Sequence, residues 1–388
     1  MSGEFFRLAS WLRGLPADIS GILAILVIAA PVEAAPAVGG MNGVMDHGAT
    51  VTIIGSGFGS KAQAAPLVWD NGSGDKILNI WSGAWPNLLP GYNTGYYSSM
   101  RGIDLPHAHA TRYIAGAHAA NTGAYSGYNV TVFKAVSFVS FPAYVYASWY
   151  QRSDDNWVFG QDNNYKVFDY SEGKEPYTAW KNWPICYGPP HPGSTKDGAQ
   201  WTIEPGAPIK NPDLKGHNSW WASAVNPMAG KWSKVEIAFK VTDQADGYVD
   251  VWENGRKVIS YVGPTDNYAG TQRTIGIGGF ARMKSPNNWR YFDDIYVDTS
   301  LARVVLADKP VLSQATIIEN QIPTAWSDRS ITATVNLGRF NQGQAAYLIV
   351  VDDSGTPSAS GLQVTAGSRG STAAGPTSPN PPSSVEVH

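Results

Sequence analysis

Three stretches of the chain alternate apolar and polar residues with a period of two, the pattern of a β-strand that buries one face. They are residues 142–152, 232–241 and 247–263. In the third, Asn254-Gly255 separates two alternating runs, and this dipeptide suits a type I′ turn because both of its residues need a positive φ. Strands joined by tight turns predict antiparallel β-sheet. Beyond the first 35 residues we find no convincing pattern of an amphipathic helix.

The composition of the chain favours the same class. Only 15% of the 388 residues are charged, whereas 41 are glycine, 19 tyrosine and 15 tryptophan. Few charges, many turn formers and many aromatics are typical of an all-β protein. An aromatic-rich polar strand face opposite an apolar one predicts two antiparallel sheets packed face to face, as in a jelly-roll β-sandwich. The net charge of −3 excludes the electrostatic footprint of a protein that binds nucleic acid.

The first 35 residues have the pattern of a secretory signal peptide. Two arginines precede the apolar run 19–30, and small residues follow it at the expected cleavage site. The run is short for a membrane span, so we expect no span in the mature protein; an uncleaved anchor is the alternative. Cys186 is the only cysteine, so no internal disulfide can form, and we expect it to be a small buried side chain. These features predict a secreted or cell-surface protein of bacterial type.

Two segments resemble a known family of extracellular domains. "DGYVDVWENGRKVISYVGPTDN" (246–267) and "NWRYFDDIYVD" (288–298) are similar to the concanavalin A-like jelly rolls of the LamG and polysaccharide-lyase type. The resemblance covers 67–308 and implies a glycan-handling protein.

The segments on either side resemble a second family. "VTIIGSGFGSK" (51–61) and "IPTAWSDRSITATVN" (322–336) are similar to the two halves of an IPT/TIG immunoglobulin-like domain. The resemblance implies a small Ig-like β-sandwich built from 38–66 plus 309–367, with the jelly roll inserted between its halves. Insertion costs little when the termini of the guest domain lie close together. Two unrelated end segments are the alternative. The polar Gly/Ser/Pro-rich end, 368–388, predicts a flexible tail.

The resemblance to jelly-roll lyases implies one set of catalytic candidates. Such lyases neutralise a uronate with Arg, Asn or Gln and move protons with His or Tyr. The residues of these types that we consider are His109, Arg112, Tyr146, Tyr150 and His217. The family's "R-[ST]-E-[LV]-R" and "Q-[IV]-H" strands are absent, as is the "E-x-D-x-x-E" strand of jelly-roll hydrolases. If the chain is an enzyme, a lyase therefore ranks above a glycoside hydrolase, which needs two paired carboxylates.

Exposed aromatic side chains are the second kind of candidate, because they stack on the apolar faces of sugar rings. Some belong to the polar strand face, which we expect to line a concave sheet, and others to the long loop 172–194. The predicted ligand-binding residues are Tyr146, Tyr150, Arg152, Trp180, Trp183, Tyr187, Tyr248 and Trp252. The alternatives are that the strand aromatics pack inside the protein and that the loop seals one end of the sandwich.

Histidine and aspartate clusters are candidates for metal binding. His107 and His109 would share one face of a strand, as a metal site, a proton-transfer pair or plain surface residues. Clustered aspartates in turns favour a structural calcium ion, which takes six to eight oxygen ligands. The predicted calcium ligands are Asp70, Asp75, Asp293 and Asp294. Turns capped by solvated carboxylates are the alternative.

Three functions are compatible with these features. The first is a secreted protein that binds an extracellular polysaccharide, with the Ig-like domain as spacer. The second is a polysaccharide lyase that uses a His/Tyr/Arg set on the same fold. The third is a structural surface protein whose aromatics make protein contacts.

Overall fold

A computed structural model describes the chain from residue 35 to residue 367, with gaps. The described ranges are 35–72, 95–97, 103–121, 127–138, 142–155, 157, 165–172, 185–188, 200–203, 219–221, 229–265, 273–283 and 289–367. Within them the regular elements are β-strands in antiparallel sheets and a short 3-10 helix, Leu312–Gln314, which confirms the predicted all-β class. The predicted signal peptide and tail lie outside these ranges. None of the described segments is a helix that could cross a membrane.

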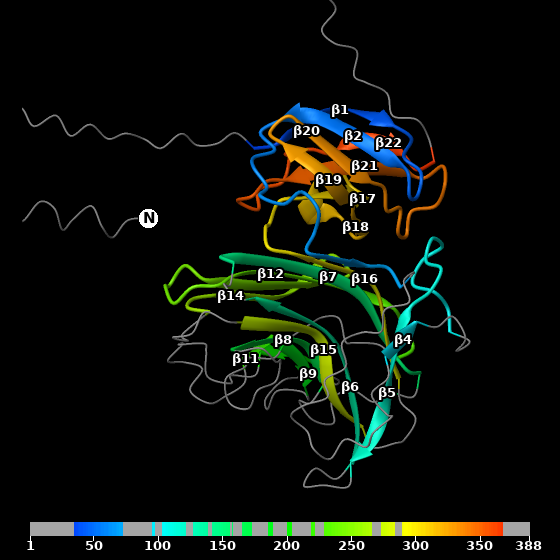
Figure 1. The fold of residues 1–388 in the computed structure, drawn as a ribbon, viewed down its shortest axis with the longest axis vertical. Coiled ribbons are helices and arrows are strands. Elements are labelled where there is room, and N and C mark those ends of the chain that lie inside the picture. The colour runs from blue at the N-terminus through cyan, green and yellow to red at the C-terminus, as the bar shows by residue number, and fades with distance from the viewer. Residues whose placement is uncertain are drawn as a thin grey trace, which may run out of the picture. The chain divides into compact units, whose positions relative to one another are not determined.

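One large sheet contains most of the strands (Figure 1). Its first half has the order β11-β10-β9-β8-β15-β6-β5, and its second half continues as β16-β7-β12-β13-β14. Two short strands lie outside this order: β3 pairs with β16 in the second half, and β4 pairs with β5 in the first. The bounds of the first half are β5 Ile114–Asn121, β6 Gly127–Phe138, β8 Tyr165–Glu172, β9 Ile185–Gly188, β10 Gln200–Ile203, β11 Ser219–Trp221 and β15 Arg273–Met283. Those of the second half are β7 Tyr144–Ser153, β12 Ser233–Lys240, β13 Tyr248–Glu253, β14 Arg256–Val262 and β16 Trp289–Asp298, and those of the two short strands are β3 Val68–Asp70 and β4 Gly95–Tyr97.

The two halves of this sheet pack against each other, because alternating side chains from both enter one apolar core. Trp149 on β7 and Phe239 on β12 enter it from one half, and Phe168 on β8 from the other. The ring of Phe168 lies 6.4 Å from that of Trp149 and 5.8 Å from that of Phe239, measured between centroids. The second half therefore turns its odd-numbered residues on β7, β12 and β13 inward and its even-numbered residues outward, as the alternation predicts.

A second core lies between two four-stranded sheets. One has the order β1-β2-β20-β19 and the other β18-β17-β21-β22. Side chains from both sheets, such as Ile53 on β2 and Leu348 on β21, fill the space between them. The bounds are β1 Ala37–Gly43, β2 Thr50–Ser56, β17 Arg303–Ala307, β18 Ile318–Asn320, β19 Ile322–Ser327, β20 Ser330–Thr334, β21 Ala345–Val351 and β22 Leu362–Thr365.

Strands far apart in sequence meet in this smaller sandwich. β2 pairs with β20, so Ile53 lies opposite Ile331 although the strands of the large sheet come between them in the chain. β17 pairs with β18 and β21, although the sequence analysis placed residues up to 308 in the jelly roll. The run Val304–Ala307 is apolar throughout, so its sequence alone does not say which core it enters. The assignment to an IPT/TIG domain stays a prediction.

The predicted Asn-Gly hairpin is present. Glu253 pairs with Arg256, so Asn254 and Gly255 form the two-residue turn between β13 and β14, and both have a positive φ (50° and 76°). A Cβ on Gly255 would lie 2.7 Å from the carbonyl oxygen of Ala315. Glycine is therefore required here for its φ and for the close approach of the loop that carries the 3-10 helix.

Candidate functional site

A pocket of about 630 Å³ lies over the outward face of β12, β13 and β14. The side chains on that face form one wall, and residues 301–318 and 354–357 form the other. Such a volume is typical of small-molecule sites. The residues of the sheet that line it are Tyr146, Glu236, Ala238, Asp246, Tyr248, Asp250, Trp252, Gly255, Lys257, Ser260 and Val262. Those of the opposite wall are Leu301, Arg303, Leu312, Ser313, Ile318, Ser354, Gly355 and Pro357.

Strand alternation brings the aromatic wall together. On β13, Val249 and Val251 are buried in the core of the large sandwich, so Tyr248, Asp250 and Trp252 face the pocket. The rings of Tyr248 and Trp252 are partly exposed. Both were predicted ligand-binding residues, and the structure places both in the same pocket.

A β-bulge adds a cation to this wall. The pairing of β13 with β14 skips one residue, Val258, so Lys257 lies opposite Trp252. The Nζ atom of Lys257 lies 5.0 Å from the centroid of the Trp252 ring and donates a hydrogen bond to Oδ2 of Asp250 at 2.8 Å. The hydroxyl of Ser260 donates to Oδ1 of the same carboxylate at 2.7 Å. Asp250 is therefore held by two donors beside the indole.

The deeper part of the pocket combines a phenol, a carboxylate and a guanidinium. Tyr146 donates a hydrogen bond to Oε1 of Glu236 at 2.5 Å. The guanidinium carbon of Arg303 lies 4.2 Å from the centroid of the Tyr146 ring, and one of its amino groups donates to the carbonyl oxygen of Leu301 at 2.8 Å. The Nε atom of Arg303 is buried and has no hydrogen-bond partner in the part of the chain that the structure describes.

The two pocket phenols keep their protons at neutral pH. Burial, aided by the nearby Tyr144 and Asp250, raises the pKa of Tyr248 to about 12. Burial and the charge of Glu236 raise the pKa of Tyr146 still further, although Arg303 acts in the opposite direction. Neither phenol is therefore prepared to act as a base, and both can serve as hydrogen-bond donors.

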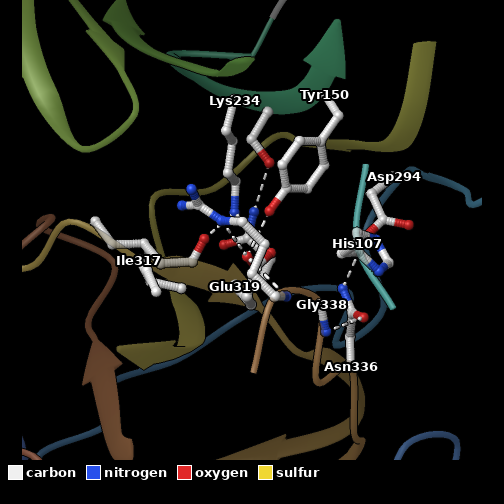
Figure 2. Close-up of polar contacts among 12 residues, drawn as sticks. His107, Tyr150, Lys234, Asp294, Ile317, Glu319, Asn336 and Gly338 are labelled. Carbon is white, nitrogen blue, oxygen red and sulfur yellow. Dashed lines mark hydrogen bonds and ion pairs between the residues drawn. The ribbon is translucent and has the colours of Figure 1, made fainter. Parts of the chain in front are cut away.

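Next to the pocket, the same face of the large sheet is covered by β18 (Figure 2). Glu319 is 1% exposed, and its Oε1 accepts a hydrogen bond from the hydroxyl of Tyr150 at 2.5 Å. Its Oε2 lies 3.4 Å from Nζ of Lys234, which also donates to the carbonyl oxygen of Ile318. Arg339 approaches the same carboxylate, with Nε 3.3 Å from Oε1.

Because β18 and its neighbours cover this face, two of the predicted ligand-binding residues are buried. Tyr146 and Tyr150 were expected on an open concave face, but they are 1% and 2% exposed. Alternation placed them correctly on the outward side of β7, whereas the residues that cover them lie about 170 positions further along the chain. A buried ring offers no face for a sugar to stack on. Arg152 is also buried, and it donates to Oδ1 of Asp155 at 2.7 Å outside the pocket.

The histidine pair does not form as expected. Residues 103–113 contain no strand, so His107 and His109 do not share a strand face. His109 donates from Nε2 to the carbonyl oxygen of Phe340 at 2.8 Å, and its ring stacks on His47 with centroids 4.9 Å apart. Arg112 is exposed.

Several other predictions cannot be placed. His217, Trp180, Trp183 and Asp75 lie outside the described residues, and only the backbone of Tyr187 is described, on β9. The catalytic and sugar-binding roles of the candidate residues stay predictions.

Two of the predicted metal ligands lie in one cluster with His107. Asp293, Asp294 and His107 each offer a ligand atom within 4.8 Å of the others. Burial raises the pKa of Asp293 well above its usual range, and the charge of Asp294 adds to this. Asp70 lies on β3, where its Oδ1 accepts from the amide of Gly72 at 3.2 Å.

Glu236, Lys257 and Arg303 are charged residues of the pocket that were not predicted from the sequence. Glu236 has the same even-numbered, outward parity as the aromatic candidates on β7 and β13, so alternation could have indicated it. Lys257 is odd-numbered and faces outward only because of the bulge at Val258, so alternation could not. Arg303 comes from the smaller sandwich, and no local pattern points to it.

Comparison with known proteins gave structural similarities alone. No protein-family model and no curated protein matches the chain. An endo-β-1,4-glucuronan lyase from the fungus Trichoderma reesei is 13% identical over 61% of this chain and 97% of its own, with a TM-score of 0.41. A marine alginate lyase from Aplysia kurodai is 11% identical over 60% and 99%, with a TM-score of 0.38. The binding domain of botulinum neurotoxin serotype G is 9% identical over 74% and 72%, with a TM-score of 0.30. Similarities of this size say nothing about what this chain binds or converts.

Proposed function

We propose that this chain binds an extracellular polysaccharide, with a short stretch of the sugar chain in the pocket over β12–β14. The observation that carries the proposal is the partly exposed pair Tyr248 and Trp252, set beside Asp250 and Ser260 in one pocket. Sugar rings have apolar faces that stack on aromatic rings and hydroxyl groups that need hydrogen-bond partners at their rims. The pocket offers both kinds of contact. A secreted or cell-surface location belongs to the same proposal.

The charges in the pocket favour a sugar with few carboxylates. Among the described residues that line it, three are acidic, Glu236, Asp246 and Asp250, and two are cationic, Lys257 and Arg303. Lys257 is already paired with Asp250. A polyanionic chain would therefore meet little uncompensated positive charge, whereas a neutral chain would not have to bring a charge into the pocket.

A polysaccharide lyase is the alternative function. The unpartnered Nε of Arg303 is the observation in its favour, because a guanidinium can neutralise a uronate carboxylate. The pKa of Tyr248, which burial raises to about 12, opposes it, because the phenol then keeps its proton at neutral pH and cannot accept one from the sugar. If the chain is an enzyme, we expect a lyase rather than a glycoside hydrolase.

Binding assays with matched variants test the proposal. We would measure depletion of the wild-type protein onto a panel of neutral and uronate-containing polysaccharides. Trp252→Ala should weaken binding about tenfold, or 1.4 kcal/mol, through the loss of one stacking platform. Tyr347→Ala is the control, since Tyr347 is a partly buried aromatic on β21 that does not line the pocket. Equal affinities for the two variants would contradict the proposed site.

Ultraviolet absorbance measured on the same mixtures of protein and polysaccharide distinguishes the other two functions. New ultraviolet absorbance from unsaturated uronate ends, lost in Arg303→Lys, would establish the lyase alternative and displace the binding proposal. Absence of both depletion and absorbance on every polymer would favour a structural surface protein.

A further inference from the structure

We propose that His107, Asp293 and Asp294 form a binding site for a divalent cation of the zinc class. One ligand atom of each residue lies within 4.8 Å of those of the other two, and all three residues are buried. None of them lines the pocket of the proposed function. The site is therefore a second one, and it does not depend on sugar binding.

An irregularity in β16 creates the carboxylate pair. Successive residues of a regular strand point to opposite faces, so Asp293 and Asp294 would be kept apart. The pairing of β16 with β7 is interrupted between Asp293 and Tyr296, and Asp294 has a φ of 47°. Aspartate is among the few residues that adopt this left-handed conformation readily. Such irregularities commonly redirect side chains at functional sites.

The cluster contains a buried carboxylate oxygen that lacks a partner. Asp293 is fully buried, and its Oδ2 has no hydrogen-bond partner among the described residues. His107 is 8% exposed, and its Nε2 lies 3.0 Å from Oδ2 of Asp294. When the proton of the imidazole is on Nδ1, the lone pair of Nε2 and this carboxylate oxygen are close enough to bind one ion. Buried lone pairs that face no donor are costly, and a cation satisfies them together.

The surroundings hold the three residues in position. Asn336 donates from Nδ2 to Oδ2 of Asp294 at 3.2 Å, and its own Oδ1 accepts from the amide of Gly338 at 3.1 Å. Oδ1 of Asp293 accepts from the amide of Asp294 at 2.8 Å. Figure 2 shows His107 next to Asp294, with Asn336 reaching up from the smaller sandwich. Hydrogen-bonded support of this kind is usual behind metal ligands.

The donor set indicates the class of ion. Calcium prefers six to eight oxygen ligands, whereas this cluster offers one imidazole nitrogen and two carboxylates. Imidazole together with carboxylate is typical of zinc and its neighbours in the first transition series. The cluster thus combines two of the predicted calcium ligands, Asp293 and Asp294, with His107.

Metal titration of the full chain tests the proposal. Protein treated with a chelator and then dialysed would be titrated with zinc chloride against a fluorescent zinc indicator, and separately with calcium chloride by calorimetry. We expect one zinc ion per chain, and a loss of affinity of at least about 100-fold in Asp293→Asn and in His107→Gln. Asp243→Asn, a change at an exposed aspartate away from the cluster, should bind zinc as the wild type does.

Cobalt(II) provides a readout that does not depend on the variants. In the wild-type chain it should give visible absorption bands of a low-coordinate site that are displaced by one equivalent of zinc. Zinc binding that is equally strong in Asp293→Asn would overturn the proposal. So would saturable calcium binding tighter than that of zinc, or a wild-type chain that takes up neither zinc nor cobalt because protons alone satisfy the cluster.

Discussion

Replacement of Glu319 by glutamine tests the contact between β18 and the large sheet. The variant keeps the size of the side chain and removes its charge. The buried ammonium of Lys234, whose side chain is 5% exposed, then has the carbonyl oxygen of Ile318 but no anionic partner. Breaking a buried ion pair on one side costs about 3–5 kcal/mol. Because the amide oxygen can still accept from Tyr150, we expect about 3 kcal/mol, at the lower end of that range.

The assay is equilibrium unfolding in urea at neutral pH, followed by tryptophan fluorescence and far-ultraviolet circular dichroism. The two sandwiches can unfold in separate steps, so the shift is read for each transition. In a thermal scan the same loss should lower the transition by about 6–12 °C, at 2–4 °C per kcal/mol for domains of this size. Asp243→Asn, which removes a charge from an exposed position, is the control and should leave the transitions in place.

A double variant tests whether Lys234 and Glu319 interact as a buried ion pair. When Lys234→Met is added to Glu319→Gln, no orphaned ammonium remains, so the double variant should be less destabilised than Glu319→Gln alone. Additive losses would refute the ion pair as described. A loss below about 0.5 kcal/mol in Glu319→Gln, the size of an ordinary surface substitution, would refute the buried contact itself.

Three further perturbations test other features. Asp308→Ala should cost about 1–2 kcal/mol, because the carboxylate accepts bonds from the hydroxyl and amide of Thr316 and from the next amide. Burial acts to raise the pKa of Asp308, but these bonds hold it below its usual value. This stability is therefore present above pH 4 and should disappear as the pH falls through the lowered pKa, which urea unfolding at several pH values would detect. Ultraviolet titration of the chain and of Tyr248→Phe should assign a phenol with a midpoint near pH 12 to this residue, and a midpoint near 10 would contradict the burial argument. Gly255→Ala should lower the urea midpoint, since its φ of 76° and the 2.7 Å approach to Ala315 leave no room for a methyl group, and an unchanged midpoint would show that the turn can relax.

Local patterns predicted the strands well because their causes are local. Alternation identified β7, β12, β13 and β14, and the Asn-Gly dipeptide identified the turn between the last two. The same patterns say which side of a strand a residue occupies but not what lies above it. Tyr150 was therefore expected to be open, whereas Glu319, 169 residues away, covers it.

Irregularities and long-range contacts were harder to predict. A single extra residue reverses which side chains of a strand face outward, but it leaves the composition of the strand unchanged. The sequence therefore gave no sign of the bulge at Val258 or of the left-handed backbone at Asp294. His107 meets Asp294 across 187 residues, and no spacing rule relates two such positions. The aspartates and His107 could each be named as metal-binding candidates from the sequence, but not that Asp293, Asp294 and His107 lie in one cluster.

The order of strands in the smaller sandwich has a mechanical consequence. β1 begins at Ala37 and β22 ends at Thr365, and both belong to the pair of four-stranded sheets. Tension applied at these two residues enters the chain through that pair of sheets, where β1 is held to β2 and β22 to β21. The strands of the large sheet that line the pocket, β12, β13 and β14, bear no load until these strand pairs separate. A protein stretched between two anchors thus yields first in its smaller sandwich, while the wall of the pocket formed by β12–β14 stays folded.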